Sequence, residues 1–231
     1  MKKIVVLSGA GVSAESGIPT FRDADGLWEG HDVMEVATPQ GFADNPALVL
    51  EFYNQRRAAL KQVEPNAAHL SIKELEKDFE VVVVTQNVDD LHERAGSSNI
   101  IHLHGELRKV RSVIDPDYVK DWTESLQLGD TCPKGGQLRP HIVWFGEDVP
   151  MIEKAAMECA SADIIIIIGT SMQVYPAASL YEFAAADAEI YYIDPKASHN
   201  VGMINRKNFT IIEEKATTGM AALIEELVTV K

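Results

Sequence analysis

Four short runs of apolar residues, none broken by a charged side chain, divide the chain. They are Ile4–Leu7, Val81–Thr85, Ile164–Ile168 and Ile190–Ile193. A strand with one solvated face alternates apolar and polar residues, whereas a strand buried on both faces is apolar throughout. The four runs are uniform and rich in β-branched residues, so we predict that they form the centre of a parallel sheet.

Segments with a helical pattern lie between these runs. We expect helices from a cap at Pro65-Asn66 to about Lys77, and over about 152–160, 175–186 and 219–230. Alternation of strands with helices is typical of a doubly wound sheet. The fold class predicted is therefore α/β, with a Rossmann-like parallel sheet.

Two segments depart from this alternation and indicate a smaller inserted lobe. Residues 24–60 carry helical patterns where a strand would be due, and residues 108–139 are polar and interrupted by prolines and glycines. A cleft between such a lobe and the sheet is a natural ligand site. We therefore expect one catalytic domain over 1–231, with a large lobe at approximately 1–23, 64–107 and 140–231 and a small lobe at approximately 24–63 and 108–139.

The charge balance argues against a nucleic-acid partner. The 231 residues include 21 basic and 35 acidic side chains, which gives a net charge of −14. Phosphate binding relies on clustered Lys and Arg, which such a chain lacks. The negative charge suits basic protein partners, although most acidic proteins are simply soluble.

The number of cysteines and the length of the apolar runs further restrict which class of protein this can be. Cys132 and Cys159 are the two cysteines of the sequence, too few for a disulfide framework or a four-cysteine zinc site. The start of the chain passes directly from Lys3 into the first strand, without the pattern of a signal peptide. The longest aliphatic run, Ile164–Ile168, is far shorter than a membrane span. We expect a cytoplasmic protein with no membrane attachment.

A glycine-rich turn follows the first predicted strand. Residues 9–14 read Gly-Ala-Gly-Val-Ser-Ala, which fits the dinucleotide fingerprint Gly-x-Gly-x-x-Gly/Ala. A tight turn with no ligand is the alternative. The acidic residue that a hydride-transfer site places about 20 positions later, after a second strand, has no counterpart. Asp23 and Asp25 lie in a non-strand segment, so the pattern favours breaking a bond of the dinucleotide over redox use.

Small or polar residues also follow the other predicted strands. Asn87 and Asp89 come after the second strand, Gly169-Thr170-Ser171 after the third and Asp194 after the fourth. The carboxyl ends of parallel strands meet at one edge of a sheet, where ligands bind. Each residue taken alone could cap a turn. Their recurrence at the strand ends favours a ligand site.

The segment Ile100–Glu106 contributes a candidate base. Its alternation puts His102 and His104 on one face. A histidine at a strand end suits general-base chemistry because its pKa lies near working pH. A purely structural histidine is the alternative. His69 and His92 are interpreted as ordinary helix histidines.

Taken together, these motifs resemble the sirtuin family, the NAD-dependent protein-lysine deacylases. The resemblance covers the chain from about residue 4 to 227 and preserves the family order. The stretches that carry it are residues 9–22, Thr85–Asp89, His104–Glu106, Val143–Glu147 and Gly169–Ser171.

The resemblance implies a role for each matching position, with NAD as co-substrate and acyl-lysine proteins as partners. The catalytic residues would be His104 and Asn87. Residues expected to bind NAD are Gly9, Ala10, Gly11, Ala14, Glu15, Phe21, Arg22, Trp28, Gln86, Asn87, Asp89, His104, Gly169, Thr170, Ser171, Asp194 and Ala216. Residues expected to bind the acyl-lysine are Ala37, Tyr53, Arg56, Val143, Trp144, Phe145 and Gly146.

The chemistry implied by the resemblance is acyl transfer to the ribose of NAD. The acyl-lysine amide oxygen would attack C1′, nicotinamide would leave, and His104 would deprotonate a ribose hydroxyl. The products would be free lysine, nicotinamide and O-acyl-ADP-ribose. Protein ADP-ribosylation and non-catalytic sensing of NAD or ADP-ribose stay open as alternatives.

The segment Phe52–Arg57 bears on which acyl group is removed. It contains the Tyr53-x-x-Arg56 signature of sirtuins that remove acidic acyl groups, and Ala37 resembles the small residue of that subclass. On a helix, residues at i and i+3 share a face, and Arg presents a planar fork to a carboxylate. We expect desuccinylation and demalonylation, with deacetylation as a second activity. An ordinary basic helix is the alternative.

The chain departs from the family at its zinc module. Most sirtuins carry two cysteine pairs before the position of Val143, but here only Cys132 remains, with Ser112 and Gly135 at expected cysteine positions. One thiolate cannot complete a tetrahedral zinc site. The small lobe is thus expected to combine a helical insert with a remnant of the zinc module. We predict no zinc and a lobe held by packing around Trp122, Leu126 and Leu138.

Overall fold

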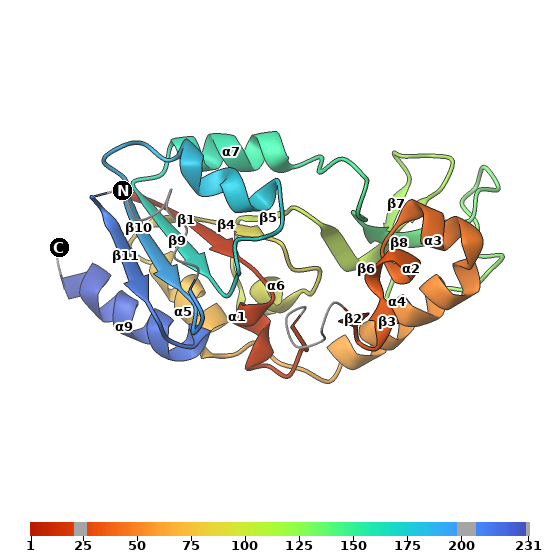
Figure 1. Cartoon of the computed structure of the whole chain (residues 1–231), viewed down its shortest axis with the longest axis horizontal. Coiled ribbons are helices and arrows are strands. Elements are labelled where there is room, and N and C mark those ends of the chain that lie inside the picture. Colours follow the sequence, from red (N-terminus) through yellow and green to blue (C-terminus); the bar gives the residue numbers. More distant parts are fainter. Residues whose placement is uncertain (21–26, 198–206, 230–231) are drawn as a thin grey trace.

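The computed structural model describes residues 1–20, 27–197 and 207–229, and it contains a six-stranded parallel sheet. The strand order is β11-β10-β9-β1-β4-β5 (Figure 1). The α/β, Rossmann-like prediction is confirmed. The strands are β1 (Lys3–Ser8), β4 (Glu80–Thr85), β5 (Ile100–His102), β9 (Ile164–Ile168), β10 (Glu189–Ile193) and β11 (Phe209–Ile212).

The four apolar runs form the four central strands, and each prediction matches the observed strand to within one residue at either end. The pattern did not reveal the outermost strand β11, and Ile100–His102 was recognised only by its alternation. Both lie at sheet edges, where one side of the strand is open and burial is incomplete. A half-buried edge strand lacks the uniform apolar signal on which the prediction rests.

Helices cover both faces of the sheet (Figure 1). On one face, α5 (Ala67–Leu75) and α9 (Ala216–Thr229) pack against the strand side chains of one parity. On the other, α7 (Ile152–Ala160) and the 3₁₀ helix η2 (Ala177–Phe183) pack against the alternate side chains. The parallel sheet is therefore buried on both sides, as its uniform composition requires.

Two helices differ from expectation. The segment expected to be helical over 175–186 is the shorter 3₁₀ helix η2, which begins after Pro176. Proline has no N–H to donate, and 3₁₀ turns suit short connections. Helix α9 begins at Ala216, so Gly219 lies inside it and does not start it. A Cβ at Gly219 would lie 2.4 Å from Cγ2 of Ile193, so glycine lets the helix approach the sheet.

A smaller lobe lies at the end of the molecule opposite the two termini (Figure 1). It combines a helical part with a three-stranded antiparallel sheet in the order β7-β6-β8. Strands β6 and β8 cross the expected lobe boundaries after residue 107 and before residue 140. The elements are β2 (Leu27–Trp28), β3 (His31–Asp32), α2 (Val33–Val36), α3 (Pro39–Asp44), α4 (Pro46–Leu60), β6 (Gly105–Ser112), β7 (Val119–Asp121) and β8 (Leu138–Ile142).

Packing in the small lobe includes the residues singled out from the sequence. Leu126, Leu138 and Cys132 are buried in one apolar cluster, and Trp122 is partly buried against it. The Ser112 hydroxyl donates to Sγ of Cys132 at 3.2 Å. A hydrogen bond thus joins two positions at which the family resemblance led us to expect cysteines. No helix in the described part of the chain is long and apolar enough to cross a membrane.

Candidate active site

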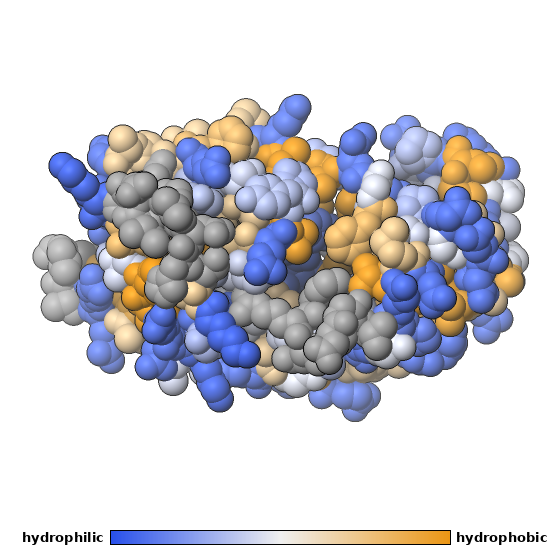
Figure 2. Space-filling model, viewed as in Figure 1, coloured by the Kyte–Doolittle hydropathy of each residue, from blue (hydrophilic) through white to orange (hydrophobic). Residues whose placement is uncertain are grey.

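The sheet topology places a crevice at the carboxyl ends of β1 and β9. These strands are neighbours, and the chain continues from them toward opposite edges of the sheet. Ligands of doubly wound sheets bind at such a switch point. The short helix α1 (Gly11–Ala14) begins there. Figure 2 shows the surface hollowed between the two lobes in this view.

The turns after β1 and β9 pack directly on one another. The N–H of Gly11 donates to the carbonyl of Gly169 at 2.7 Å, and the N–H of Gly9 donates to that of Ile168 at 3.1 Å. A Cβ at Gly11 would lie 2.7 Å from Cα of Gly169, and Gly169 itself has φ +62. Backbone packing alone therefore requires these glycines. The case for a ligand rests on the polar groups around them.

Asn87 and Asp89 lie in a buried hydrogen-bonded network beside this turn. Asn87 Nδ2 donates to Oγ of Ser13 at 3.1 Å, and Ser13 Oγ donates to Oδ2 of Asp89 at 3.0 Å. Asp89 Oδ1 accepts from the N–H of Leu91, where α6 (Leu91–Ala95) begins. Burial raises the pKa of Asp89 to about 6, against the lowering effect of these hydrogen bonds. The second strand end is thus tied to the glycine-rich turn.

Two buried histidines complete the network, and sequence reasoning missed their contacts. His92 Nε2 lies 3.0 Å from Oγ of Ser8, and His69 Nε2 lies 3.5 Å from Oγ of Ser13. Burial lowers the pKa of His69 to about 4 and that of His92 to about 3, so both rings are neutral at physiological pH. The available signal was His69 three residues after the helix cap Asn66, whose N–H donates to His69 Nδ1.

His104 is placed as the sequence suggested, just beyond β5. Its Nδ1 lies 3.1 Å from the carbonyl oxygen of Gln86. In the neutral ring Nδ1–H donates to this carbonyl, which leaves the lone pair on Nε2 to accept a proton. Burial lowers the pKa of His104, against the raising effect of the Gln86 bond, and so favours this basic form.

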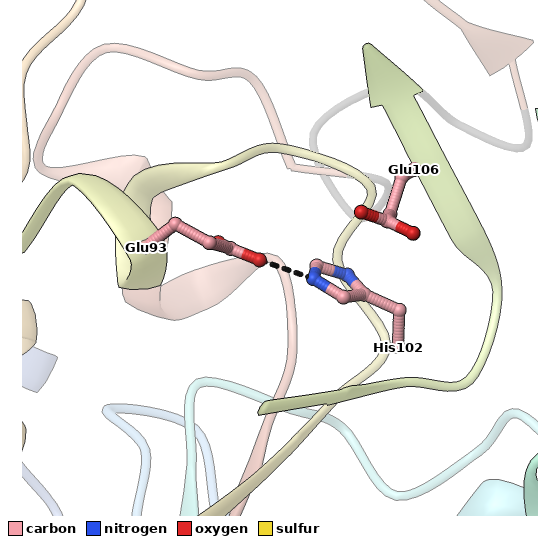
Figure 3. Close-up of side chains that lie close together, drawn as sticks. All are labelled: Glu93, His102 and Glu106. Atoms are coloured by element: carbon pink, nitrogen blue, oxygen red, sulfur yellow. Dashed lines mark hydrogen bonds and ion pairs between the residues drawn. The ribbon is translucent and has the colours of Figure 1, made fainter. Parts of the chain in front are cut away.

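His102 has the opposite environment, shown in Figure 3. Its Nε2 lies 2.5 Å from Oε1 of Glu93, and its Nδ1 lies 3.3 Å from the carbonyl oxygen of Asn87. Burial lowers the pKa of His102, but the hydrogen bond and charge of Glu93, with Glu106 beyond it, outweigh burial and raise the pKa overall. His102 therefore secures the turn that carries Asn87.

The same three side chains are the one group of potential metal ligands in the described residues. The ligand atoms of Glu93, His102 and Glu106 lie within 4.8 Å of one another (Figure 3). Each already has a protein partner, because Glu93 pairs with His102 and Glu106 pairs with Lys109 at 2.9 Å. The group is therefore accounted for as an ion-pair cluster.

The remaining strand-end residues are brought toward the same edge. Gln86 Nε2 donates to Oγ1 of Thr170 at 3.2 Å, which links β4 to β9. Asp194 is 2% exposed and accepts the N–H of Lys196. Ala10, Gly11 and Ser171 are half-buried, while Ala14 and Glu15 are exposed.

Glu15 connects the glycine-rich turn to the start of α9. Its carboxylate accepts from the N–H of Thr217 at 3.1 Å and from the hydroxyl of Thr217 at 3.0 Å. Ala216, the residue expected near adenine, is buried next to this contact. Phe21 and Arg22, also expected at the cofactor, lie outside the described residues.

The residues expected to bind acyl-lysine lie mainly in the small lobe. Ala37, Tyr53 and Trp144 share one buried apolar cluster, and Trp144 Nε1 donates to the Tyr53 hydroxyl at 3.0 Å. The N–H of Phe145 donates to the carbonyl of Ala37, and the Phe145 side chain is 46% exposed. Burial raises the pKa of Tyr53, which keeps its O–H protonated. Val143 is half-buried and Gly146 is exposed.

Arg56 lies beside this cluster on α4. Its guanidinium stacks over the Phe52 ring at 3.2 Å from the centroid, and Trp28 lies at 5.4 Å. Nη1 donates to the Phe52 carbonyl, and Nη2 lies 3.5 Å from Oε2 of Glu29. Burial lowers the pKa of Arg56 to about 10, against the raising effect of Glu29, so the group stays charged. Trp28, expected at the cofactor, thus packs with the residues expected at the acyl group.

Comparisons with known proteins decide the family. A model described as the Sir2 family matches residues 9–176, well over half of the chain. The chain belongs to the Sir2 family. A Helicobacter pylori protein named NAD-dependent protein deacylase is 59% identical over 228 residues, covering 99% of this chain and 98% of that protein. A Bacteroides thetaiotaomicron protein of the same name is 51% identical and covers 99% of both chains.

Solved Sir2 structures have the same architecture as this Sir2 protein. A Sir2 homologue in complex with NAD superposes with a TM-score of 0.88 at 40% identity, covering 99% of this chain and 90% of that chain. A mutant Sir2 homologue in complex with 2′-O-acetyl ADP ribose gives a TM-score of 0.87 at 39% identity, covering 99% and 93%. The six-stranded sheet and the small antiparallel sheet are thus those of Sir2 structures.

The two neighbouring histidines of this Sir2 protein should titrate in opposite directions. His104 is expected to titrate below 6.5, because burial disfavours its charged form, and His102 above 6.5, because Glu93 holds its proton. Imidazole resonances followed by ¹⁵N-detected NMR across the pH range measure both, with His104→Asn and His102→Asn used for assignment. Titration of both rings together near 6.5 would contradict the geometry described.

Proposed function

We propose that this Sir2 protein removes both acidic and neutral acyl groups from protein lysine side chains, with His104 as its general base. The chain is an NAD-dependent protein deacylase, the activity for which both relatives are named. The observation that carries the assignment of the base is the contact between His104 Nδ1 and the Gln86 carbonyl. It fixes the ring so that Nε2 is the basic nitrogen.

The residues at the carboxyl ends of the strands are suited to binding NAD. Buried Asn87, Asp89 and Asp194 offer polar groups at the switch point, and the glycine-rich turn begins a helix beside them. Bound NAD supplies an electrophilic ribose carbon, with nicotinamide as leaving group. The other residues proposed to hold it are those named above around the turns after β1, β4 and β9, with Glu15 and Ala216.

Each catalytic side chain has a role that its position supports. Asn87, whose amide donates to Ser13 beside the glycine-rich turn, would orient the carboxamide and ribose. His104, neutral because burial lowers its pKa, would accept a proton from a ribose hydroxyl. The products would be nicotinamide, free lysine and O-acyl-ADP-ribose. The solved Sir2 homologue with 2′-O-acetyl ADP ribose supports this product.

The lysine-bearing peptide is proposed to bind along residues 143–146. The N–H of Val143 donates to the carbonyl of His104 at 2.9 Å, so this segment is attached directly to the catalytic residue. Exposed Phe145 and Gly146 follow it. An extended peptide can add to such an exposed backbone as a further strand, and binding through the main chain depends little on the peptide sequence.

Acidic acyl groups are proposed to meet Arg56 and Tyr53. Within the described part of the chain, Nε of Arg56 is buried with no hydrogen-bond partner. A buried donor left unpaired is unfavourable, and a carboxylate would satisfy it. The Tyr53 hydroxyl accepts from Trp144 and can still donate its own proton. Ala37 lies in the same cluster, and its small side chain is proposed to suit a longer acyl chain.

Replacing the base tests the reaction class. His104→Asn should lower turnover of an acyl-lysine peptide by about 10²–10⁴-fold, because general-base catalysis supplies that much. Mass spectrometry should detect O-acyl-ADP-ribose from the native protein. Attachment of ADP-ribose to the protein substrate would indicate a transferase, and unchanged behaviour of His104→Asn would indicate a sensor.

Replacing the guanidinium tests the acyl preference. Arg56→Met should lower kcat/KM for succinyl- and malonyl-lysine peptides at least about tenfold, the value of a charge-assisted bidentate bond, and leave the acetyl peptide nearly unchanged. Lys61→Met is the matched control, because Lys61 ends the same helix but pairs with Glu124 at the surface. Equal loss on acidic and acetyl peptides would rule out the carboxylate clamp.

We also propose that the small lobe holds no structural zinc. Ser112 donates to Cys132 and accepts the N–H groups of Ile114 and Asp115, each at 3.2 Å. Hydrogen bonds within the protein thus hold together the segments that zinc ligands would join in a zinc module. Plasma mass spectrometry of protein purified without chelators should find far less than one zinc per chain. Stoichiometric zinc would overturn this proposal.

A further inference from the structure

Glu29 is positioned beside the guanidinium proposed to recognise acidic acyl groups. It lies in the hairpin between β2 and β3 and has φ +50, followed by Gly30 with φ +82. Positive φ at both central residues is the usual conformation of a two-residue hairpin turn. Glu29 contacts Arg56 on α4, across the small lobe.

This ion pair leaves part of the hydrogen-bonding capacity of the guanidinium unused. Oε2 of Glu29 lies 3.5 Å from Nη2 of Arg56, longer than a charge-assisted hydrogen bond of about 2.7–2.9 Å. On the same edge of the fork, Nε is buried with no hydrogen-bond partner among the described residues. A carboxylate that engaged both nitrogens would bind better than Glu29 does.

The two partners also differ in exposure. The Arg56 side chain is 11% exposed, whereas that of Glu29 is 38% exposed. Leaving a largely buried cation unpaired is unfavourable, but a half-exposed carboxylate can return to water at little cost. Glu29 is therefore the partner that can leave.

We propose that Glu29 is an exchangeable counterion of Arg56, paired with it when the acyl group is neutral and displaced when the acyl group carries its own carboxylate. The inference rests on the proposed acyl function and deepens it. Without Glu29, an acetyl-lysine would cover Arg56 and leave a buried charge unpaired. With Glu29, one acyl pocket serves neutral and acidic chains.

Removing the Glu29 charge should therefore separate the two substrate classes. Glu29→Gln should lower KM for a succinyl-lysine peptide, because no internal carboxylate competes for Arg56, and raise KM for the matched acetyl-lysine peptide. The ratio of kcat/KM for the succinyl peptide to kcat/KM for the acetyl peptide should rise roughly threefold to tenfold. Loss of a half-exposed ion pair has an effect of this size when it favours one substrate and disfavours the other. The change should lie in KM and not in kcat.

Glu51→Gln provides the matched control. Glu51 is an exposed residue on α4 whose carboxylate accepts a hydrogen bond from Gln55 Nε2, so the variant removes the same charge from the same lobe. Its ratio should equal that of the native protein. Glu29→Asn is the second variant, because Asn tolerates a positive φ while also removing the charge. It should raise the ratio as Glu29→Gln does.

A double variant tests whether the effect of Glu29 depends on Arg56. In an Arg56→Met background, Glu29→Gln should have no effect on the ratio, because its partner is absent. An unchanged or lower ratio in both Glu29 variants, with Arg56→Met still selective against succinyl peptides, would overturn the counterion role and leave the proposed acyl function intact. Equal loss of kcat/KM on succinyl and acetyl peptides in Arg56→Met itself would instead reject the acyl function on which the inference rests.

Discussion

The structure depends on the contact between the backbone turns that follow β1 and β9. The N–H of Gly11 donates to the carbonyl of Gly169 at 2.7 Å, at the point where the chain diverges to the two halves of the sheet. A side chain on either residue would overlap the opposite backbone. This contact closes the sheet at its centre and brings the strand ends of both halves to one edge, so the proposed cofactor site exists only because the two turns can touch.

Burial at that edge sets the protonation of the site. Burial disfavours the charged form of each titratable group there. It lowers the pKa values of His69, His92 and His104 and raises that of Asp89. His102 is the exception, because Glu93 supplies a compensating charge. Two histidines separated by one residue thus have pKa values shifted in opposite directions, upward at His102 and downward at His104.

The small lobe is attached to this edge through backbone bonds near His104, the proposed base. Val143 donates to the carbonyl of His104, and Phe145 donates to that of Ala37. The segment proposed to bind peptide therefore spans from the base to the cluster that contains Tyr53. Movement of the proposed acyl-binding cluster relative to His104 would require breaking these bonds, so the two proposed parts of the site are held together.

The sequence by itself determined the central strands, the α/β class and the strand-end motifs, because uniform apolar runs and glycine-polar turns are local signals. It also led us to propose roles for His104 and for the pair Tyr53 and Arg56, and these roles stay predictions. Only the tertiary structure decided the edge strand β11, the link of His69 to Ser13, the packing of Trp28 against Arg56 and the role open to Glu29. These features depend on which distant segments come into contact and on how deeply they are buried. A local sequence pattern predicts neither the contacts nor the burial.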